Sequence, residues 1–112
     1  MTVNLTFSDL QSYLADHYCG RATDHGMFMK LVEEIGEVAE VLNKLAGRKA
    51  SAETDLKEQL GIELADMIHY IVAIAALNDI DLTKLIIEKD KKAAIKYHHK
   101  MDLETFLQNT KE

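Results

Sequence analysis

Proline and tryptophan are absent from this 112-residue chain, which contains one cysteine and five glycines. Without proline, little in the sequence interrupts long helices. Cys19 has no second cysteine to pair with. An intrachain disulfide framework is therefore excluded, and a reducing, cytoplasmic setting is expected.

The chain has fewer basic than acidic residues. The 13 lysines and arginines are outnumbered by 19 aspartates and glutamates, which gives a formal net charge of −6. This balance argues against a protein that holds nucleic acid by bulk positive charge. No basic leader with an apolar core opens the sequence, and the longest apolar stretch, residues 70–77, is too short to span a membrane. No membrane partner is therefore expected.

The length and the 47% of apolar residues predict one globular domain over residues 1–112. No segment alternates as a half-buried strand does, so we expect an all-α fold, an antiparallel bundle of four to five helices. The first expected helix is capped by Ser8 or Asp9 and runs to Tyr18. The second, 25–46, has Thr23 or Asp24 as its cap and ends at Gly47, and the third, 55–77, ends at Asn78 and Asp79. The fourth, 82–98, is capped by Asp81, and a short fifth helix capped by Asp102 runs to Gln108. Residues 47–54 are expected to form a polar connection.

Helical spacing places apolar side chains on particular faces. On the second expected helix they form one stripe with Glu34 at its edge: Leu31, Ile35, Val38, Leu42 and Leu45. Beyond Tyr70 the third helix is apolar on nearly every side, as in a helix that is buried all round. Because a monomer of this size can hardly surround one helix, we expect oligomerisation to complete the bundle, in a homodimer or homotetramer.

Two pairs of carboxylates stand at three-residue spacing within apolar surroundings. Glu34 and Glu37 form the first pair, and Glu63 and Asp66 form the second. Each pair shares one helix face, where like charges repel one another unless a cation lies between them. Mg²⁺ held by few carboxylates usually has substrate phosphates in its shell. The residues alone leave two interpretations open, a divalent-metal site and solvated surface charge.

The residues around these acids resemble a known family. Glu33-Glu34-x-x-Glu37, followed after 25 residues by Glu63-x-x-Asp66, is similar to the signature of the all-α nucleoside triphosphate pyrophosphohydrolases, the MazG-like group. The flanks match as well, and the likeness covers roughly residues 25–97.

This resemblance implies that Glu34, Glu37, Glu63 and Asp66 bind Mg²⁺, with Mn²⁺ as a substitute. The family reaction cleaves a nucleoside triphosphate between the α and β phosphates and releases a monophosphate and pyrophosphate. Metal ions suit this chemistry because they neutralise phosphates and lower the pKa of an attacking water. Glu33 is a candidate to orient or deprotonate that water, and a solvated helix acid is the alternative interpretation.

Lysines late in the chain are candidates for phosphate binding. Lys89, Lys92 and Lys96 share a helix face by their spacing, and Lys89 matches a lysine that is common in the family. The family often has an asparagine four residues later, where this chain has Ala93. The details of phosphate or sugar contact therefore stay open.

The sequence indicates the nucleobase-binding residues less clearly than the metal ligands. The candidates are Tyr18, His25, Phe28 and Tyr70, and there is no tryptophan to stack on a base. Phe28 is more typical of a core residue, and His25 of a helix cap or the surface. His69 is interpreted as a hydrogen-bonded interface histidine.

The sequence therefore predicts a Mg²⁺-dependent pyrophosphohydrolase acting on a deoxynucleoside or non-standard nucleoside triphosphate, in a pocket that borrows residues from a second subunit. Phosphoribosyl-ATP is the alternative substrate. A di-iron or dimanganese bundle would need a Glu-x-x-His pair, which the sequence lacks. A non-catalytic helical dimerisation or binding module is the remaining alternative.

Overall fold

The protein is all-α in the part of the chain that the computed structural model describes, residues 2–47 and 55–110. Its helices are α1 (Phe7–Tyr18), α2 (Asp24–Leu45), α3 (Leu56–Leu77), α4 (Leu82–Lys96) and α5 (Leu103–Thr110). The prediction of an all-α fold is confirmed, and each expected helix is present close to its expected bounds. Of the expected polar connection, residues 48–54 lie outside the described residues.

The helices begin beside side chains that accept hydrogen bonds from the first turn, where backbone N–H groups have no helical partner. Thr6 caps α1 by accepting from the backbone N–H of Asp9 at 3.0 Å. The prediction of Ser8 or Asp9 as this cap is wrong, because the helix begins earlier and contains both residues. Three caps occur as predicted, with backbone N–H groups donating at 2.8–3.1 Å to Thr23, Asp81 and Asp102.

Residues in the left-handed conformation end several helices. Gly47 has a φ of +74° after α2, as predicted for a residue without a Cβ. Asp79 has a φ of +54° in the turn after α3. His98 has a φ of +55°, so α4 ends at Lys96, earlier than the predicted end at His98.

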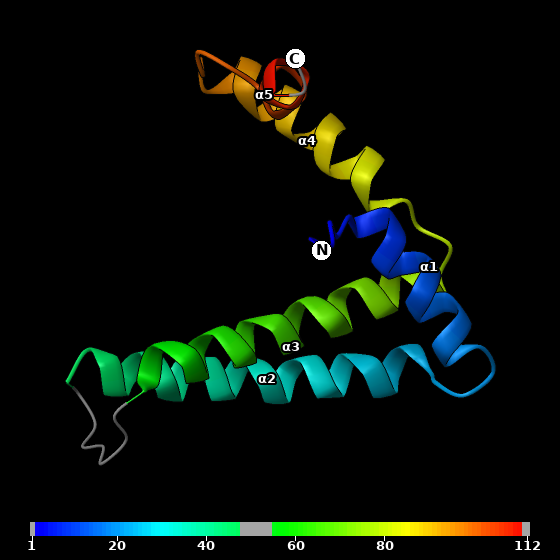
Figure 1. The fold of residues 1–112 in the computed structure, drawn as a ribbon, viewed down its shortest axis with the longest axis vertical. Helices are drawn as coiled ribbons and strands as arrows, with labels where there is room; N and C mark the ends of the chain where they lie inside the picture. The colour runs from blue at the N-terminus through cyan, green and yellow to red at the C-terminus, as the bar shows by residue number, and fades with distance from the viewer. Residues whose placement is uncertain (1, 48–54, 111–112) are drawn as a thin grey trace.

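α2 and α3 form an antiparallel hairpin, and α1 packs across the end of α3 (Figure 1). At this junction Leu14 of α1 is fully buried against Val72 and Ala73 of α3. Partly buried side chains surround these three: Leu10, Tyr18, Met27, Ala76 and Leu82. Burial of apolar surface here holds α1 against the hairpin.

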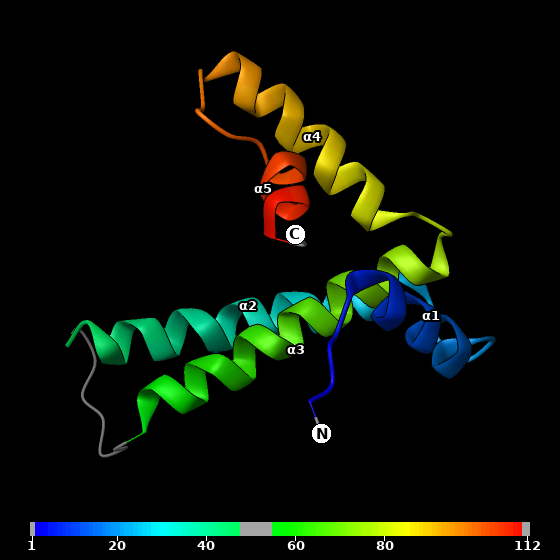
Figure 2. The same ribbon diagram turned by 45° about the horizontal axis from the view of Figure 1, so that its top comes forward.

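α4 and α5 extend away from the hairpin as an arm (Figures 1 and 2). The side-chain amide of Gln11 in α1 fixes the turn before the arm, because its Nε2 donates to the carbonyl of Ile80 at 2.5 Å and its Oε1 accepts from the N–H of Leu82 at 3.1 Å. The radius of gyration is 17.3 Å, against about 13 Å for a compact domain of this length. The predicted antiparallel bundle is therefore only partly formed within one chain.

The buried face of α2 differs from the predicted stripe. Val41 is 1% exposed, whereas three members of the stripe are nearly half exposed: Ile35, Leu42 and Leu45. Leu31, Glu34 and Val38 are half-buried and share a face with Val41 by their spacing. The predicted stripe is thus partly wrong, and Glu34 lies within the buried face, not at its edge.

α3 is long and apolar enough to cross a membrane by length and composition alone. No such segment was expected, because Glu63 and Asp66 interrupt α3 and no uncharged run in the sequence is long enough to span a membrane. The core helix of a soluble protein has the same composition, and α3 packs against both α1 and α2. This one helix therefore does not indicate a membrane protein.

The core junction can be tested with Leu14→Ala. We expect this change to lower the free energy of unfolding by about 2–5 kcal/mol, because it leaves a cavity at a fully buried position. Val3→Ala is the control, since Val3 is 86% exposed and should change stability by less than about 0.5 kcal/mol. Urea unfolding followed by circular dichroism measures both. Equal stability of the two variants would contradict the packing of α1 on α3.

Candidate metal centre

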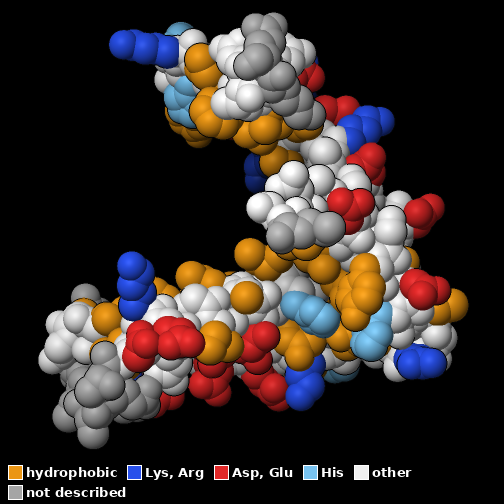
Figure 3. Space-filling view, viewed as in Figure 1, with side chains coloured by type: hydrophobic (Ala, Val, Ile, Leu, Met, Phe, Trp, Pro, Cys, Tyr) orange, Lys and Arg blue, Asp and Glu red, His pale blue; other side chains and the backbone are white. Residues whose placement is uncertain are grey.

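The hairpin brings three carboxylates together near its middle. One oxygen from each of Glu34, Glu63 and Asp66 lies within 4.8 Å of the others, and all three residues are half-buried. Glu63 and Asp66 stand one turn apart on α3, and Glu34 approaches them from α2. Acidic side chains gather along this part of the hairpin in the space-filling view (Figure 3). The cluster therefore depends on the pairing of the two helices.

The surroundings of Glu34 change its pKa. A hydrogen bond with Glu63 raises the pKa of the Glu34 carboxyl from 4.5 to about 7, and burial and the charges of neighbouring acids add to the effect. Its Oε2 atom is buried and has no hydrogen-bond partner among the described residues. A buried polar atom normally has such a partner. This oxygen therefore lacks a cation or hydrogen-bond donor that would satisfy it.

The chemistry of these donors fits a hard divalent cation. Mg²⁺ and Mn²⁺ prefer oxygen ligands, and carboxylates are their usual protein ligands. A cation held by Glu34, Glu63 and Asp66 would give the buried Oε2 its missing partner. It would also offset the mutual repulsion that favours the protonated form of Glu34.

Two other predicted acids lie beside the cluster. Glu37 is exposed one turn after Glu34 and outside the group of three, although its charge contributes to the raised pKa of Glu34. Glu33 is exposed, and its Oε2 lies 3.6 Å from the Nζ of Lys30. The structure therefore brings together three of the four predicted ligands and leaves Glu37 and Glu33 at their margin.

Gln59 was not identified from the sequence. It is half-buried one turn before Glu63 on α3, and its Oε1 is buried without a hydrogen-bond partner among the described residues. An amide can offer an oxygen to a cation or an N–H to a phosphate. The signal that could have revealed it is its four-residue spacing from Glu63 on the same helix face.

Two of the predicted base-binding residues, Tyr18 and Tyr70, both contact His69. The hydroxyl of Tyr18 lies 2.6 Å from the Nε2 of His69, and their rings meet edge to face. The His69 ring is also edge to face with Tyr70, with centroids 5.0 Å apart. The structure thus joins Tyr18 to Tyr70, whereas His25 and Phe28 are exposed.

The predicted phosphate-binding lysines lie on the arm. Lys89, Lys92 and Lys96 are exposed on α4, which packs against α1 and α5. Figures 1 and 2 show that the arm points away from the hairpin that carries the acids. Within one chain, the structure does not bring these lysines to the carboxylate cluster.

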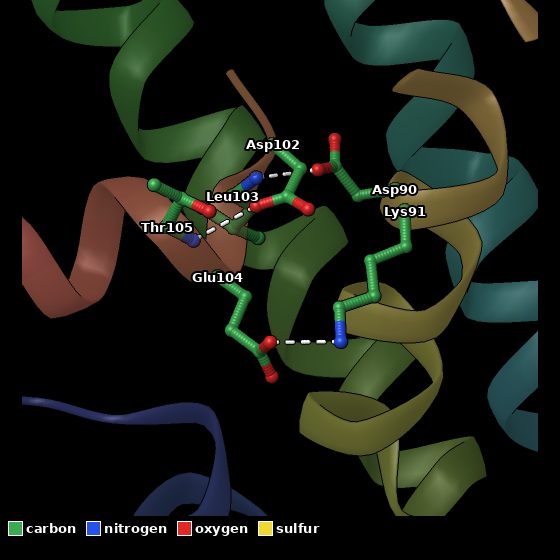
Figure 4. A network of polar contacts seen from close by, with 6 residues as sticks. All are labelled: Asp90, Lys91, Asp102, Leu103, Glu104 and Thr105. Atoms are coloured by element: carbon green, nitrogen blue, oxygen red, sulfur yellow. Dashed lines mark hydrogen bonds and ion pairs between the residues drawn. The ribbon is translucent and has the colours of Figure 1, made fainter. Parts of the chain in front are cut away.

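Polar contacts hold the two helices of the arm together (Figure 4). Lys91 of α4 forms an ion pair with Glu104 of α5 at 2.7 Å, and Asp90 accepts from the backbone N–H of Leu103 at 2.6 Å. Lys91 therefore has a structural partner, unlike the three lysines predicted to bind phosphate, which form no ion pair among the described residues.

The raised pKa of Glu34 predicts how pH affects the metal-free protein. The folded state keeps this proton up to a pH of about 7, whereas the unfolded chain releases it near 4.5. The stability that this proton contributes is therefore present at low pH and is lost as the pH rises from about 4.5 to 7. We expect the melting temperature without Mg²⁺ to fall over this range, and to fall less in Glu34→Gln.

The same protonation predicts that Mg²⁺ binds more tightly as the pH rises through about 7, because the metal displaces the proton. Mg²⁺ at about one hundred times its Kd should stabilise the wild type by about 2.7 kcal/mol. Thermal unfolding at several pH values with and without Mg²⁺ measures both effects. A Mg²⁺ effect that is absent, or equal in wild type and Glu34→Gln, would contradict the metal centre.

Comparison with known proteins gives this cluster a family context. A family model for the MazG nucleotide pyrophosphohydrolase domain matches residues 22–101, and no curated protein matches the chain. The matched region contains α2, α3 and α4, and with them all three clustered carboxylates. Since the match covers most of the chain, the protein belongs to the MazG family of nucleotide pyrophosphohydrolases, which are generally dependent on a divalent metal.

Proposed function

We propose that the protein is a Mg²⁺-dependent enzyme that hydrolyses a nucleoside triphosphate to the monophosphate and pyrophosphate. Its substrate would be a deoxynucleoside or non-standard nucleoside triphosphate, and the protein would act in the cytoplasm. The observation that carries this proposal is the cluster of Glu34, Glu63 and Asp66 with the unpaired, buried Oε2 of Glu34. Membership of the MazG family supports the reaction class.

Glu34, Glu63 and Asp66 would hold the metal, with Glu37 available from the next turn of α2. Bound Mg²⁺ would neutralise phosphate charge and lower the pKa of a nearby water. Glu33 is exposed on the same helix, where its carboxylate can orient a water or accept its proton as water adds to phosphorus. The water would add to either the α or the β phosphorus. The bond between that phosphorus and the oxygen that bridges the α and β phosphates would break, which releases the monophosphate and pyrophosphate.

The active unit would be an oligomer, a homodimer or a homotetramer. Large apolar side chains are half exposed on both hairpin helices, among them Ile35 and Leu42 of α2 and Ile62 and Ile71 of α3. Large exposed apolar side chains of this kind would be covered where a second subunit packs on the hairpin. The arm also leaves its lysines far from the acids of its own hairpin. We infer that Lys89, Lys92 and Lys96 bind phosphates at the cluster of a second subunit.

The metal ligands can be tested by Glu34→Gln and Asp66→Asn, which keep the size of the side chain and remove its charge. Each variant should lower pyrophosphate release by at least about 100-fold, because each removes a ligand that positions the phosphates. Glu58→Gln is the matched control, since Glu58 is an exposed acid at the start of α3. Assays should include the common and deoxynucleoside triphosphates, non-standard ones and phosphoribosyl-ATP. Full activity in either ligand variant, with Mg²⁺ present, would contradict the assignment.

Contributions from two subunits can be tested by mixing inactive variants. One variant carries Glu63→Gln, and the other carries Lys89→Gln with Lys92→Gln. In a random mixture of dimers half are mixed, and each mixed dimer regains one of its two sites, so about one quarter of the wild-type activity should return. If the lysines serve the acids of their own chain, mixing restores no activity. Each variant alone, at the same concentration, is the control.

A further inference from the structure

The rings on the hairpin lie on one side of the carboxylate cluster. No histidine or aromatic residue occurs between residues 34 and 66, a stretch of sequence that includes the second half of α2 and the first half of α3. His69 and Tyr70 follow on α3, and α1 packs on that end of the helix. Histidine and hydrophobic side chains lie next to the acidic ones on this face in Figure 3. A planar ring attached to phosphates at the cluster finds aromatic partners only in this direction along the hairpin.

His69 occupies a particular place at this end. It follows Asp66 by three residues, so the two side chains are neighbours one turn apart. Its half-buried ring lies between Tyr18 and Tyr70, edge to face with both, at centroid distances of 5.7 and 5.0 Å. The ring is therefore oriented by contacts from α1 as well as from its own helix.

The hydrogen bond to Tyr18 selects the tautomer of His69. The Tyr18 hydroxyl lies 2.6 Å from Nε2, a distance that suits an O–H group donating to a neutral imidazole nitrogen. Burial raises the pKa of Tyr18, which keeps its proton on the phenol. When Nε2 accepts, the ring proton is on Nδ1. The ring then offers an N–H donor at its second nitrogen.

That second nitrogen is available to a ligand. The bond to Tyr18 is the one hydrogen bond that His69 forms among the described residues. Nδ1 is not among the buried polar atoms that lack a partner, so solvent or a ligand can reach it. Tyr70 lies beside it with an aromatic face or edge for a planar group.

We propose that His69 is a specificity-determining residue, which donates a hydrogen bond from Nδ1 to an acceptor atom on the edge of the nucleobase. Tyr18 is the positioning residue that fixes this donor. This inference rests on the proposed function and deepens it, because it names the ring-bearing end of the substrate and the group that recognises it. A site that hydrogen-bonds one base edge discriminates against bases that lack the acceptor there, since they leave the donor unpaired.

The first test reads the tautomer and needs no catalysis. Nitrogen-15 NMR of the metal-free wild type should show the His69 proton on Nδ1. In Tyr18→Phe, which keeps the ring and removes the hydroxyl, the Nε2–H form should become substantially populated. The Nε2–H form in the wild type, or identical spectra of the two proteins, would overturn the proposal.

The second test separates recognition from support. His69→Asn places an amide N–H near the position of Nδ1, and His69→Gln places its amide near Nε2. In His69→Gln, the kcat/KM ratio between the best and the worst base should fall about tenfold. In His69→Asn it should stay within about threefold of the wild type. The inhibition constant of methyl triphosphate, a competitor without a base, should be unchanged in both, and His99→Gln is a control for the same substitution on the exposed turn after α4.

The outcomes are distinct. An unchanged ratio in His69→Gln, together with a lowered ratio in His69→Asn, would assign His69 to support of Tyr18 and overturn the proposal. Equal weakening of methyl triphosphate and nucleotide would do the same, as would a wild type that hydrolyses all bases alike. A folded wild type that hydrolyses no triphosphate would contradict the proposed function, and this inference with it.

Discussion

The convergence of Glu34 with Glu63 and Asp66 is the constraint on which the centre of the hairpin depends. Three carboxylates within 4.8 Å cannot all be ionised and buried without a compensating charge. A proton on Glu34 relieves part of this repulsion, as its pKa of about 7 indicates. A divalent cation bound there would relieve more of it. The same contact that favours metal binding therefore weakens the metal-free hairpin, so that the stability of the fold and the occupancy of the site are linked.

Much of this arrangement follows from local sequence, and the errors have a common cause. Helix bounds were predictable because caps such as Thr23, Asp81 and Asp102 act within one turn of their own position. Three-residue spacing and the family signature indicated all three clustered acids, together with Glu37, which lies outside the cluster. The buried face of α2 was not, because α2 carries two apolar stripes. Spacing alone does not decide whether Val41 or Leu42 faces α3, and only packing in three dimensions places Glu34 within the buried face.

Contacts between distant segments could not be found in the same way. Tyr18 and His69 are separated by 51 positions, and a hydrogen bond between them has no signature in either local sequence. Gln11 reads as a polar residue on an amphipathic helix, yet its amide bonds both to Ile80 and to Leu82. An antiparallel bundle completed by oligomerisation was expected, but nothing in the local sequence showed where α4 would lie. The contacts of Gln11 hold the turn from which α4 leads away from the hairpin.

This turn bears on the proposal that the arm lysines serve a second subunit, because it keeps them away from the acids of their own chain. The side-chain amide of Gln11 forms hydrogen bonds with Ile80 and Leu82 between α3 and α4. The hydroxyl groups of Ser8 in α1 and Thr83 in α4 lie 3.3 Å apart and add a second contact between these helices. To fold back over its own acids, α4 would have to give up these hydrogen bonds and leave the carbonyl of Ile80 and the N–H of Leu82 to find other partners. A second subunit can cover the exposed apolar side chains of the hairpin without that loss. The hydrogen bonds of Gln11 are therefore compatible with the proposed assembly, in which the arm of one chain would meet the hairpin of another. The same helix, α1, also places Tyr18 beside His69.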